Sequence, residues 1–146
     1  MFLAMLAGLL VGVPAGVGMY TFIYARGASY LTNDPSACAN CHVMQNHYAA
    51  WMKSSHRTAA ACNDCHTPAS LIPKYLVKGN NGFWHSFAFT TQRFHEPIQI
   101  KPGNLRVTEN ACRKCHSNIV DAIEGPHNEV GKISCVKCHS TVGHVE

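Results

Sequence analysis

The sequence predicts a mainly α-helical protein: one N-terminal transmembrane helix, then a small domain of short helices and loops with little side-chain core of its own. Two observations predict this fold class. The first 25 residues contain no charged side chain. The rest of the chain contains a five-residue pattern, C-x-x-C-H, four times, and the four copies use all eight cysteines.

The repeated pattern occupies residues 38–42, 62–66, 112–116 and 135–139. C-x-x-C-H is the attachment site of c-type haem, because two thiols one helical turn apart can add to the two vinyl groups of one porphyrin. The adjacent histidine then reaches the iron. We therefore expect four covalently bound haem c groups that form most of the core. The attachment cysteines are Cys38, Cys41, Cys62, Cys65, Cys112, Cys115, Cys135 and Cys138.

Disulfides and zinc are poorer explanations of the same cysteines. A disulfide framework gives no reason for a histidine after each pair, and zinc ribbons complete their sites with further cysteines or a spaced histidine pair. Haem attachment takes place on the extracytoplasmic side of a membrane, where free thiols would otherwise oxidise. The net charge of +4, without a long basic run, does not indicate nucleic acid binding.

Residues 1–26 are predicted to form a transmembrane signal anchor in the cytoplasmic (inner) membrane. As a helix, 25 residues extend about 37 Å, enough to cross a hydrocarbon core of about 30 Å with tilt. The stretch is too long for the apolar region of a cleaved signal peptide, and Tyr20, Phe22 and Tyr24 suit an aromatic interface belt before Arg26. No lysine or arginine precedes the stretch, so either the orientation is fixed by other means or the protein begins further upstream.

Residues 27–146 are predicted to form a tetrahaem cytochrome c domain facing the periplasm or extracytoplasmic space, built as two dihaem units. Residues 27–66 carry haems 1 and 2, and residues 112–146 carry haems 3 and 4. The intervening residues 67–111 contain four of the six phenylalanines and an amphipathic segment. This insert is expected to lie in the membrane interface; the alternative is that its aromatic side chains cover porphyrin faces.

The iron ligands are predicted less directly. The second axial ligands of the haems come from histidines outside the motifs, and spacing alone does not pair them. Met44 lies two residues after His42, so its short tether keeps it on the His42 face of haem 1. Met44 is either packing or displaces His42 from the iron, which would raise the potential.

One anchor, four C-x-x-C-H sites and a first site that reads C-x-x-C-H-x-M resemble the NapC/NrfH family of membrane-anchored tetrahaem cytochromes. The nearest branch is the small subunit of cytochrome c nitrite reductase, a menaquinol dehydrogenase. The resemblance covers essentially the whole chain. It implies a hetero-oligomer in which the chain oxidises menaquinol and passes electrons to a multihaem periplasmic cytochrome c, either the nitrite reductase catalytic subunit or a related octahaem enzyme.

The resemblance also implies roles for residues. Met44 would ligate haem 1 in place of His42, His144 would be the distal ligand of haem 2, and His56 that of haem 3. The motif histidines His66, His116 and His139 would ligate the irons of haems 2, 3 and 4. His127 is the internal candidate for the last ligand of haem 4, which the partner enzyme can supply instead.

The quinol site implied by the resemblance lies in the insert. Lys78 matches a lysine that lines the quinol pocket. His85 stands seven residues on, where some family members carry an aspartate, and it is predicted to be a proton acceptor, an iron ligand or both. Two other functions remain open: a tethered electron carrier without a quinol site, and an electron-exchange subunit of a hydroxylamine-oxidoreductase-like complex.

Overall fold

The structure, a computed structural model, describes residues 1–125 and 133–144. Within these residues the chain forms α-helices and short 3-10 helices and no strand. The predicted mainly α fold is therefore confirmed.

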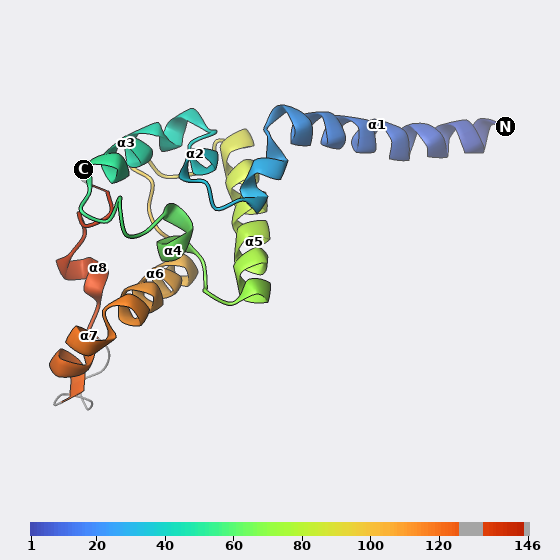
Figure 1. Cartoon of the computed structure of the whole chain (residues 1–146). Helices are drawn as coiled ribbons and strands as arrows, with labels where there is room; N and C mark the ends of the chain where they lie inside the picture. The colour runs from blue at the N-terminus through green and yellow to red at the C-terminus, as the bar shows by residue number, and fades with distance from the viewer. Residues whose placement is uncertain (126–132, 145–146) are drawn as a thin grey trace.

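Helix α1 (Phe2–Tyr24) projects away from the rest of the molecule (Figure 1). It continues across Pro14, has a mean hydropathy of 2.0, and buries none of its residues against the protein. Within the described residues it is the one helix long and apolar enough to cross a membrane. An exposed apolar helix of 23 residues has the length and composition of a membrane-spanning helix.

The chain turns sharply after α1, where Arg26 has a positive φ of 51°. Asp34 then starts the first motif helix, because its side chain accepts a hydrogen bond from Ser36 N at 2.9 Å and Pro35 fits the first helical turn. The elements of this region are η1 (Gly27–Leu31), α2 (Pro35–Cys38), η2 (His42–Met44) and α3 (Gln45–Lys53).

The second half of the domain contains the two longest helices after α1. Its elements are α4 (Cys62–His66), α5 (Leu71–Thr90), α6 (Pro102–Cys115), α7 (Ser117–Glu124) and α8 (Cys135–Cys138). Helix α5 lies beside the foot of α1, whereas α7 lies at the opposite end of the domain (Figure 1). Helix α6 starts inside the predicted insert and ends in the third C-x-x-C-H motif.

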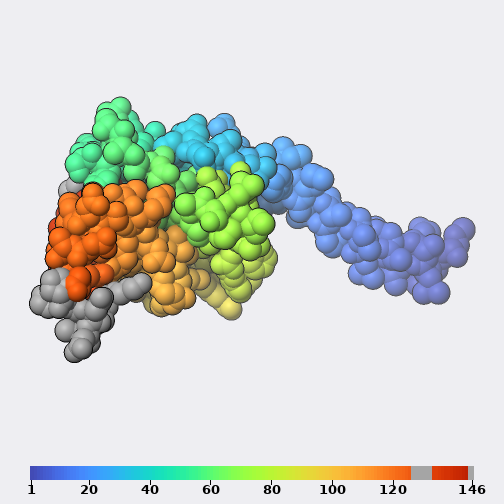
Figure 2. All heavy atoms as spheres, turned by 60° about the horizontal axis from the view of Figure 1, so that its bottom comes forward, coloured from blue at the N-terminus to red at the C-terminus, as the bar shows by residue number. Residues whose placement is uncertain are grey.

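The polypeptide supplies almost no side-chain core. Among the described residues, the buried apolar side chains are Ala37 and Ala39, and the buried polar ones are Asn63 and Thr67. A folded monomer of 16.0 kDa is expected to expose about 7,400 Å², whereas this chain exposes 11321 Å². Helix α1, which stands clear of the domain in Figure 2 and buries none of its residues, accounts for part of the excess. The rest fits a domain in which bound porphyrins, and not side chains, fill the interior.

Buried polar contacts connect the first two motifs. Asn63 of α4 donates to the carbonyl oxygen of Thr32 and to Oδ1 of Asn33, each at 3.2 Å. Thr67 in turn donates its hydroxyl to the carbonyl oxygen of Asn63 at 2.7 Å. These bonds attach the second motif helix to the segment that leads out of α1.

Candidate functional site

The four C-x-x-C-H motifs are all held in or at the end of helical turns. In α4 and α8 the helix begins at the first cysteine of the motif, and in α6 it ends at the second. All eight cysteines are free thiols, half-buried or exposed. A helical turn places two thiols on one face, the arrangement that addition to the two vinyl groups of a porphyrin requires. The donor set therefore fits haem c.

The motif helices pack against one another in chain order. Helix α2 contacts α4, α4 contacts α6, and α6 contacts α8. At the first junction the side chains of Cys38 and Cys62 share a hydrogen bond. Between α4 and α6, the Cys65 thiol lies close enough to Cys112 for a charge on Cys112 to raise the pKa of Cys65. Between α6 and α8, Cys112 affects the pKa of Cys135 in the same way.

Histidine rings from distant segments meet at two places in the domain, and at one of them the centre of the His47 ring also lies 5.2 Å from that of His144. The ring centres of His56 and His116 are 6.1 Å apart, and those of His66 and His144 are 5.9 Å apart. Two imidazoles on opposite sides of one metal ion have centres roughly 6 Å apart, since each metal–nitrogen distance is about 2 Å. Each pair could thus hold one iron. The pairs are those that the family resemblance implied for haems 3 and 2.

One ring nitrogen of His144 and one of His56 have a hydrogen-bonding partner. Nδ1 of His144 lies 3.1 Å from the carbonyl oxygen of His47, and Nδ1 of His56 lies 3.3 Å from the hydroxyl of Ser55. A hydrogen bond at Nδ1 fixes the ring orientation and leaves Nε2 for a metal.

His66 is neutral at pH 7, the state in which an imidazole can bind a metal ion. Burial is the main cause, and the neighbouring imidazoles of His144, His47 and His85 add to it, so that the pKa of His66 falls to about 4.

Met44 and His42 belong to the same 3-10 helix, η2. The His42 ring packs edge-on against Phe89 near the end of α5, with ring centres 5.7 Å apart. Met44 is half-buried, whereas His42 is exposed. His139 follows α8 as its C-cap. His127 lies outside the described residues.

Lys78 lies where α5 meets the segment that leads out of α1. Its Nζ donates a hydrogen bond of 2.6 Å to the carbonyl oxygen of Thr32 and lies 5.6 Å from the ring centre of Tyr75. Tyr75 itself donates to the carbonyl oxygen of Leu31 at 3.2 Å. Desolvation, and then Lys74, lower the pKa of Lys78. Lys78 is also within electrostatic range of Cys38 in the first motif.

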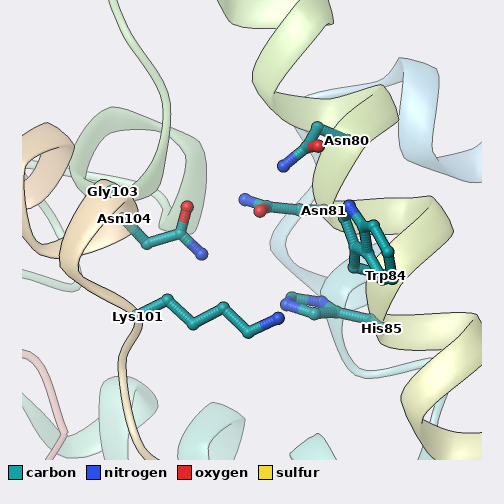
Figure 3. A pocket seen from close by; sticks show the side chains of 7 residues that line it. All are labelled: Asn80, Asn81, Trp84, His85, Lys101, Gly103 and Asn104. Carbon is teal, nitrogen blue, oxygen red and sulfur yellow. The ribbon is translucent and has the colours of Figure 1, made fainter.

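His85 lines a pocket of about 230 Å³ between α5 and the start of α6 (Figure 3). The pocket contains one ammonium, one indole and three carboxamides, and Nζ of Lys101 lies 5.7 Å from the Trp84 ring centre. Loss of hydration at the ring, and then the charge of Lys101, lower the pKa of His85. The lining residues are Asn80, Asn81, Trp84, His85, Lys101, Gly103 and Asn104.

Lys78 and His85 share one face of α5 but contact different neighbours. Lys78 reaches η1, while His85 reaches the start of α6 (Figure 3). Sequence reasoning did not find Lys101 as a neighbour of His85. No local pattern indicates it, because Lys101 lies 16 residues further along the chain and meets α5 through tertiary packing.

The comparisons with known proteins agree with this geometry. The sequence model of the NapC/NirT cytochrome c family, N-terminal region, matches residues 1–146. The cytochrome c-type protein NrfH of Wolinella succinogenes is 32% identical, over 90% of this chain and 80% of that protein. The cytochrome c-type protein NapC of Escherichia coli K12 is 27% identical, over 77% of this chain and 68% of that protein.

A solved structure also resembles the chain. The crystal structure of the cytochrome c nitrite reductase NrfHA complex bound to the HQNO inhibitor contains a chain that superposes with a TM-score of 0.63. The two chains are 26% identical, and the superposition covers 91% of this chain and 88% of the other.

A membrane-length apolar helix followed by a helical domain with repeated C-x-x-C-H sites defines a membrane-anchored c-type cytochrome. The match over the full length places the chain more narrowly: it belongs to the NapC/NirT cytochrome c family. The resemblance inferred from the motifs is thus confirmed, and with it the covalent attachment of haem c. With one apolar helix at its N-terminus, the protein is a single-pass membrane cytochrome.

Proposed function

We propose that this protein binds four haem c groups, oxidises menaquinol at the outer surface of the cytoplasmic membrane, and passes the electrons to a multihaem partner such as the catalytic subunit of cytochrome c nitrite reductase. The observation that carries the proposal is the order of the four attachment helices. They pack as α2, α4, α6 and α8, starting beside the foot of the membrane helix and ending away from it.

Helix α5 is suited to the membrane interface. At 100° per residue, four exposed apolar side chains of α5 fall within about 60° of one another. These are Ile72, Leu76, Phe83 and Phe87, which are between 42% and 73% exposed. Lys78 and His85 lie on the opposite side, against the rest of the domain. An apolar stripe toward lipid and a polar face toward protein would admit a quinol from the bilayer to the polar face.

The spacing of Lys78 and His85 suits a quinol head group. Their Cα atoms are separated by about 10.5 Å along the helix axis. A ring roughly 5 Å across, with a hydrogen bond of about 2.8 Å at each oxygen, spans a similar length. One ammonium hydrogen of Lys78 is engaged by the carbonyl oxygen of Thr32, so two remain for a quinol oxygen.

Quinol oxidation also needs a proton acceptor. Because its pKa is lowered, His85 is neutral near pH 7 and can accept a proton from the quinol hydroxyl at a ring nitrogen. The haems, when bound, take up the two electrons of the quinol and release them to the partner. The two cysteines of each motif would hold one haem, and the pairs His66–His144 and His56–His116 would bind the irons of haems 2 and 3.

The proposed partner rests on the relatives. NrfH of Wolinella succinogenes and the chain in the NrfHA complex resemble this protein over most of its length. In that complex the partner is a cytochrome c nitrite reductase subunit. Co-purification of the full-length protein, followed by haem counting in the complex, tests whether this partner or an octahaem enzyme is bound.

Vesicle reconstitution tests the quinol site. Full-length holoprotein in lipid vesicles should be reduced by a menaquinol analogue, measured as the rise of the reduced haem absorbance. Lys78→Ala and His85→Gln should each slow this reduction at least tenfold and leave reduction by a soluble artificial donor unchanged. Lys53→Ala, at the exposed end of α3, is the matched control and should behave as wild type. If both site variants keep full quinol activity, the quinol site lies elsewhere, and His47 or Glu96 should be tested next.

A further inference from the structure

Helix α8, which carries the fourth attachment site, is a single helical turn of four residues. So short a helix does not form by itself in water, because the entropy lost in nucleation exceeds what its few hydrogen bonds return. Its first backbone N–H groups also lack partners within the helix. Something outside α8 must therefore hold Cys135 and Cys138 one turn apart.

Glu109 of α6 provides these partners. Its carboxylate accepts hydrogen bonds from the hydroxyl of Ser134 at 2.7 Å, from Cys135 N at 2.8 Å and from Val136 N at 3.1 Å. Ser134 also caps its own helix, since its hydroxyl oxygen accepts from Lys137 N at 3.3 Å. Glu109 and Ser134 together satisfy the first three N–H groups of α8.

A second contact lies one turn further along α6. Arg113 forms an ion pair of 2.5 Å with Glu124 of α7 and donates to the carbonyl oxygen of Ile133. Ile133 N donates to Glu124 at 3.0 Å. This contact fixes the residue before Ser134. The cation of Arg113 forms its ion pair with Glu124 and also interacts electrostatically with Glu109.

The Glu109 carboxylate is a stable negative charge between the third and fourth sites. Partial burial opposes its ionisation, but the hydrogen bonds from Ser134, Cys135 and Val136 outweigh this effect and lower its pKa to about 2. Glu109 is three residues before Cys112 and in direct contact with Cys135. A negative charge at this place stabilises the oxidised, more positive state of a nearby haem iron.

We propose that Glu109 is a positioning residue that holds α8, the helical turn of the fourth attachment site, against α6, the helix of the third site, and that its charge keeps the potential of the haem at Cys135 and Cys138 low. The hydrogen bonds of Glu109 to α8, called the clasp below, set the geometry between α6 and α8. The charge makes the last haem a better electron donor to a docked partner. The inference rests on the proposed four-haem content.

Glu109→Gln tests the charge. The glutamine keeps the shape of the side chain and one acceptor oxygen but removes the negative charge. In a spectroscopic redox titration of the full-length holoprotein, the haem of the fourth site should shift most to higher potential, that of the third site less, and those of the first two sites should stay. Asp121→Asn, which neutralises an exposed carboxylate on α7, is the control and should leave every component unchanged.

Glu109→Ala and Ser134→Ala test the clasp. Mass spectrometry of proteolytic peptides measures haem occupancy at each motif separately. Glu109→Ala should lower occupancy at Cys135 and Cys138 by more than half, with the other three motifs fully loaded. Ser134→Ala keeps the charge, so it should lower occupancy less and leave the potential of the loaded protein unchanged. If Glu109→Gln binds too little haem to be titrated, Ser134→Ala still separates the effect of the hydrogen bonds on haem occupancy from the effect of the charge on the haem potential.

The outcomes distinguish this inference from the proposed function. Wild-type protein without haem on the peptide of Cys135 and Cys138 would defeat both. A fully loaded wild type, together with a Glu109→Gln variant of unchanged potentials and a Glu109→Ala variant of unchanged occupancy, would defeat the role of Glu109 alone.

Discussion

At the scale of single residues, His42 and Met44 are the two candidates for the iron ligand of the first haem. The His42 ring is exposed and packs against Phe89, whereas Met44 is half-buried in the same short helix. If Met44 binds the iron, Met44→His should lower the midpoint potential of haem 1 and slow quinol oxidation, because imidazole favours ferric iron more than a thioether does. His42→Ala should be milder. A redox titration checks both variants, and loss of the haem 1 signal in His42→Ala alone would contradict the assignment.

The distal histidines give a prediction of a different kind. His56→Ala and His144→Ala should each convert one low-spin haem to high spin without lowering the haem content, because the thioether bonds remain. Electron paramagnetic resonance and a haem assay on the same preparation measure the two quantities. A variant with an unchanged number of low-spin haems would remove its residue from the list of ligands.

The eight cysteines could be predicted from the sequence because the chemistry of attachment is local, within five residues. The histidine pairs could not be derived from spacing, since His56 meets His116 and His66 meets His144 across 60 and 78 residues. Glu109 had no local signal either, because its three partners lie 25 to 27 residues later.

At the scale of elements, α5 combines an exposed apolar stripe with a polar face that holds Lys78 and His85. The pocket at its end gives a pH prediction. His85 can accept a proton only when neutral, so quinol oxidation should fall as the pH drops through its pKa. Lys101 helps to lower that pKa, so Lys101→Met should raise it toward the ordinary value of about 6.5.

The acid limb of the pH–rate profile should therefore move to higher pH in Lys101→Met, with the rate at pH 8 nearly unchanged. Steady-state quinol oxidation between pH 5 and pH 8 measures the shift. An acid limb that stays in place would exclude His85 as the titrating group. Reduction by a soluble artificial donor over the same range corrects for effects of pH on the haems.

Helix α1 could be predicted from the sequence to within about two residues, because length and apolarity decide a membrane span. The bounds of α6 could not. Its first turns belong to the amphipathic insert and its last turn to a haem motif, so two patterns that appear separate in the sequence form one continuous helix. That continuity places Glu109 within reach of α8.

At the scale of the whole molecule, the membrane helix and the haem domain should be separable. When residues 1–26 are replaced by a cleavable signal peptide, the domain should mature with its full haem content and be recovered without detergent. It should accept electrons from a soluble donor but lose quinol oxidation, because the substrate is dissolved in the bilayer. Haem counting and the two reduction assays test this. Undiminished quinol oxidation by the released domain would show that the anchor is not needed to bring enzyme and substrate together.

The order of the four motif helices in space follows their order in the sequence, which the spacing of the motifs alone could not establish. The near absence of buried side chains was also expected from four haem sites in 146 residues. The segments that cover each haem site are determined by contacts between residues distant in the sequence. Composition carries no information about such contacts.

The position of His144 bears on biogenesis. Its ring faces His66 and its Nδ1 rests on the backbone of His47, although 97 residues separate it from His47. If the chain is exported with its N-terminal segments first, the thiols of the early motifs emerge and can be loaded while later segments are still in transit. His144, the proposed second ligand of haem 2, would then emerge last, after the two following sites. A stalled or truncated nascent chain would therefore carry a haem whose iron lacks its second protein ligand. Such a haem would react with oxygen, and the incomplete chain would be open to proteases. Only completed export would supply His144 and protect the cytochrome from both.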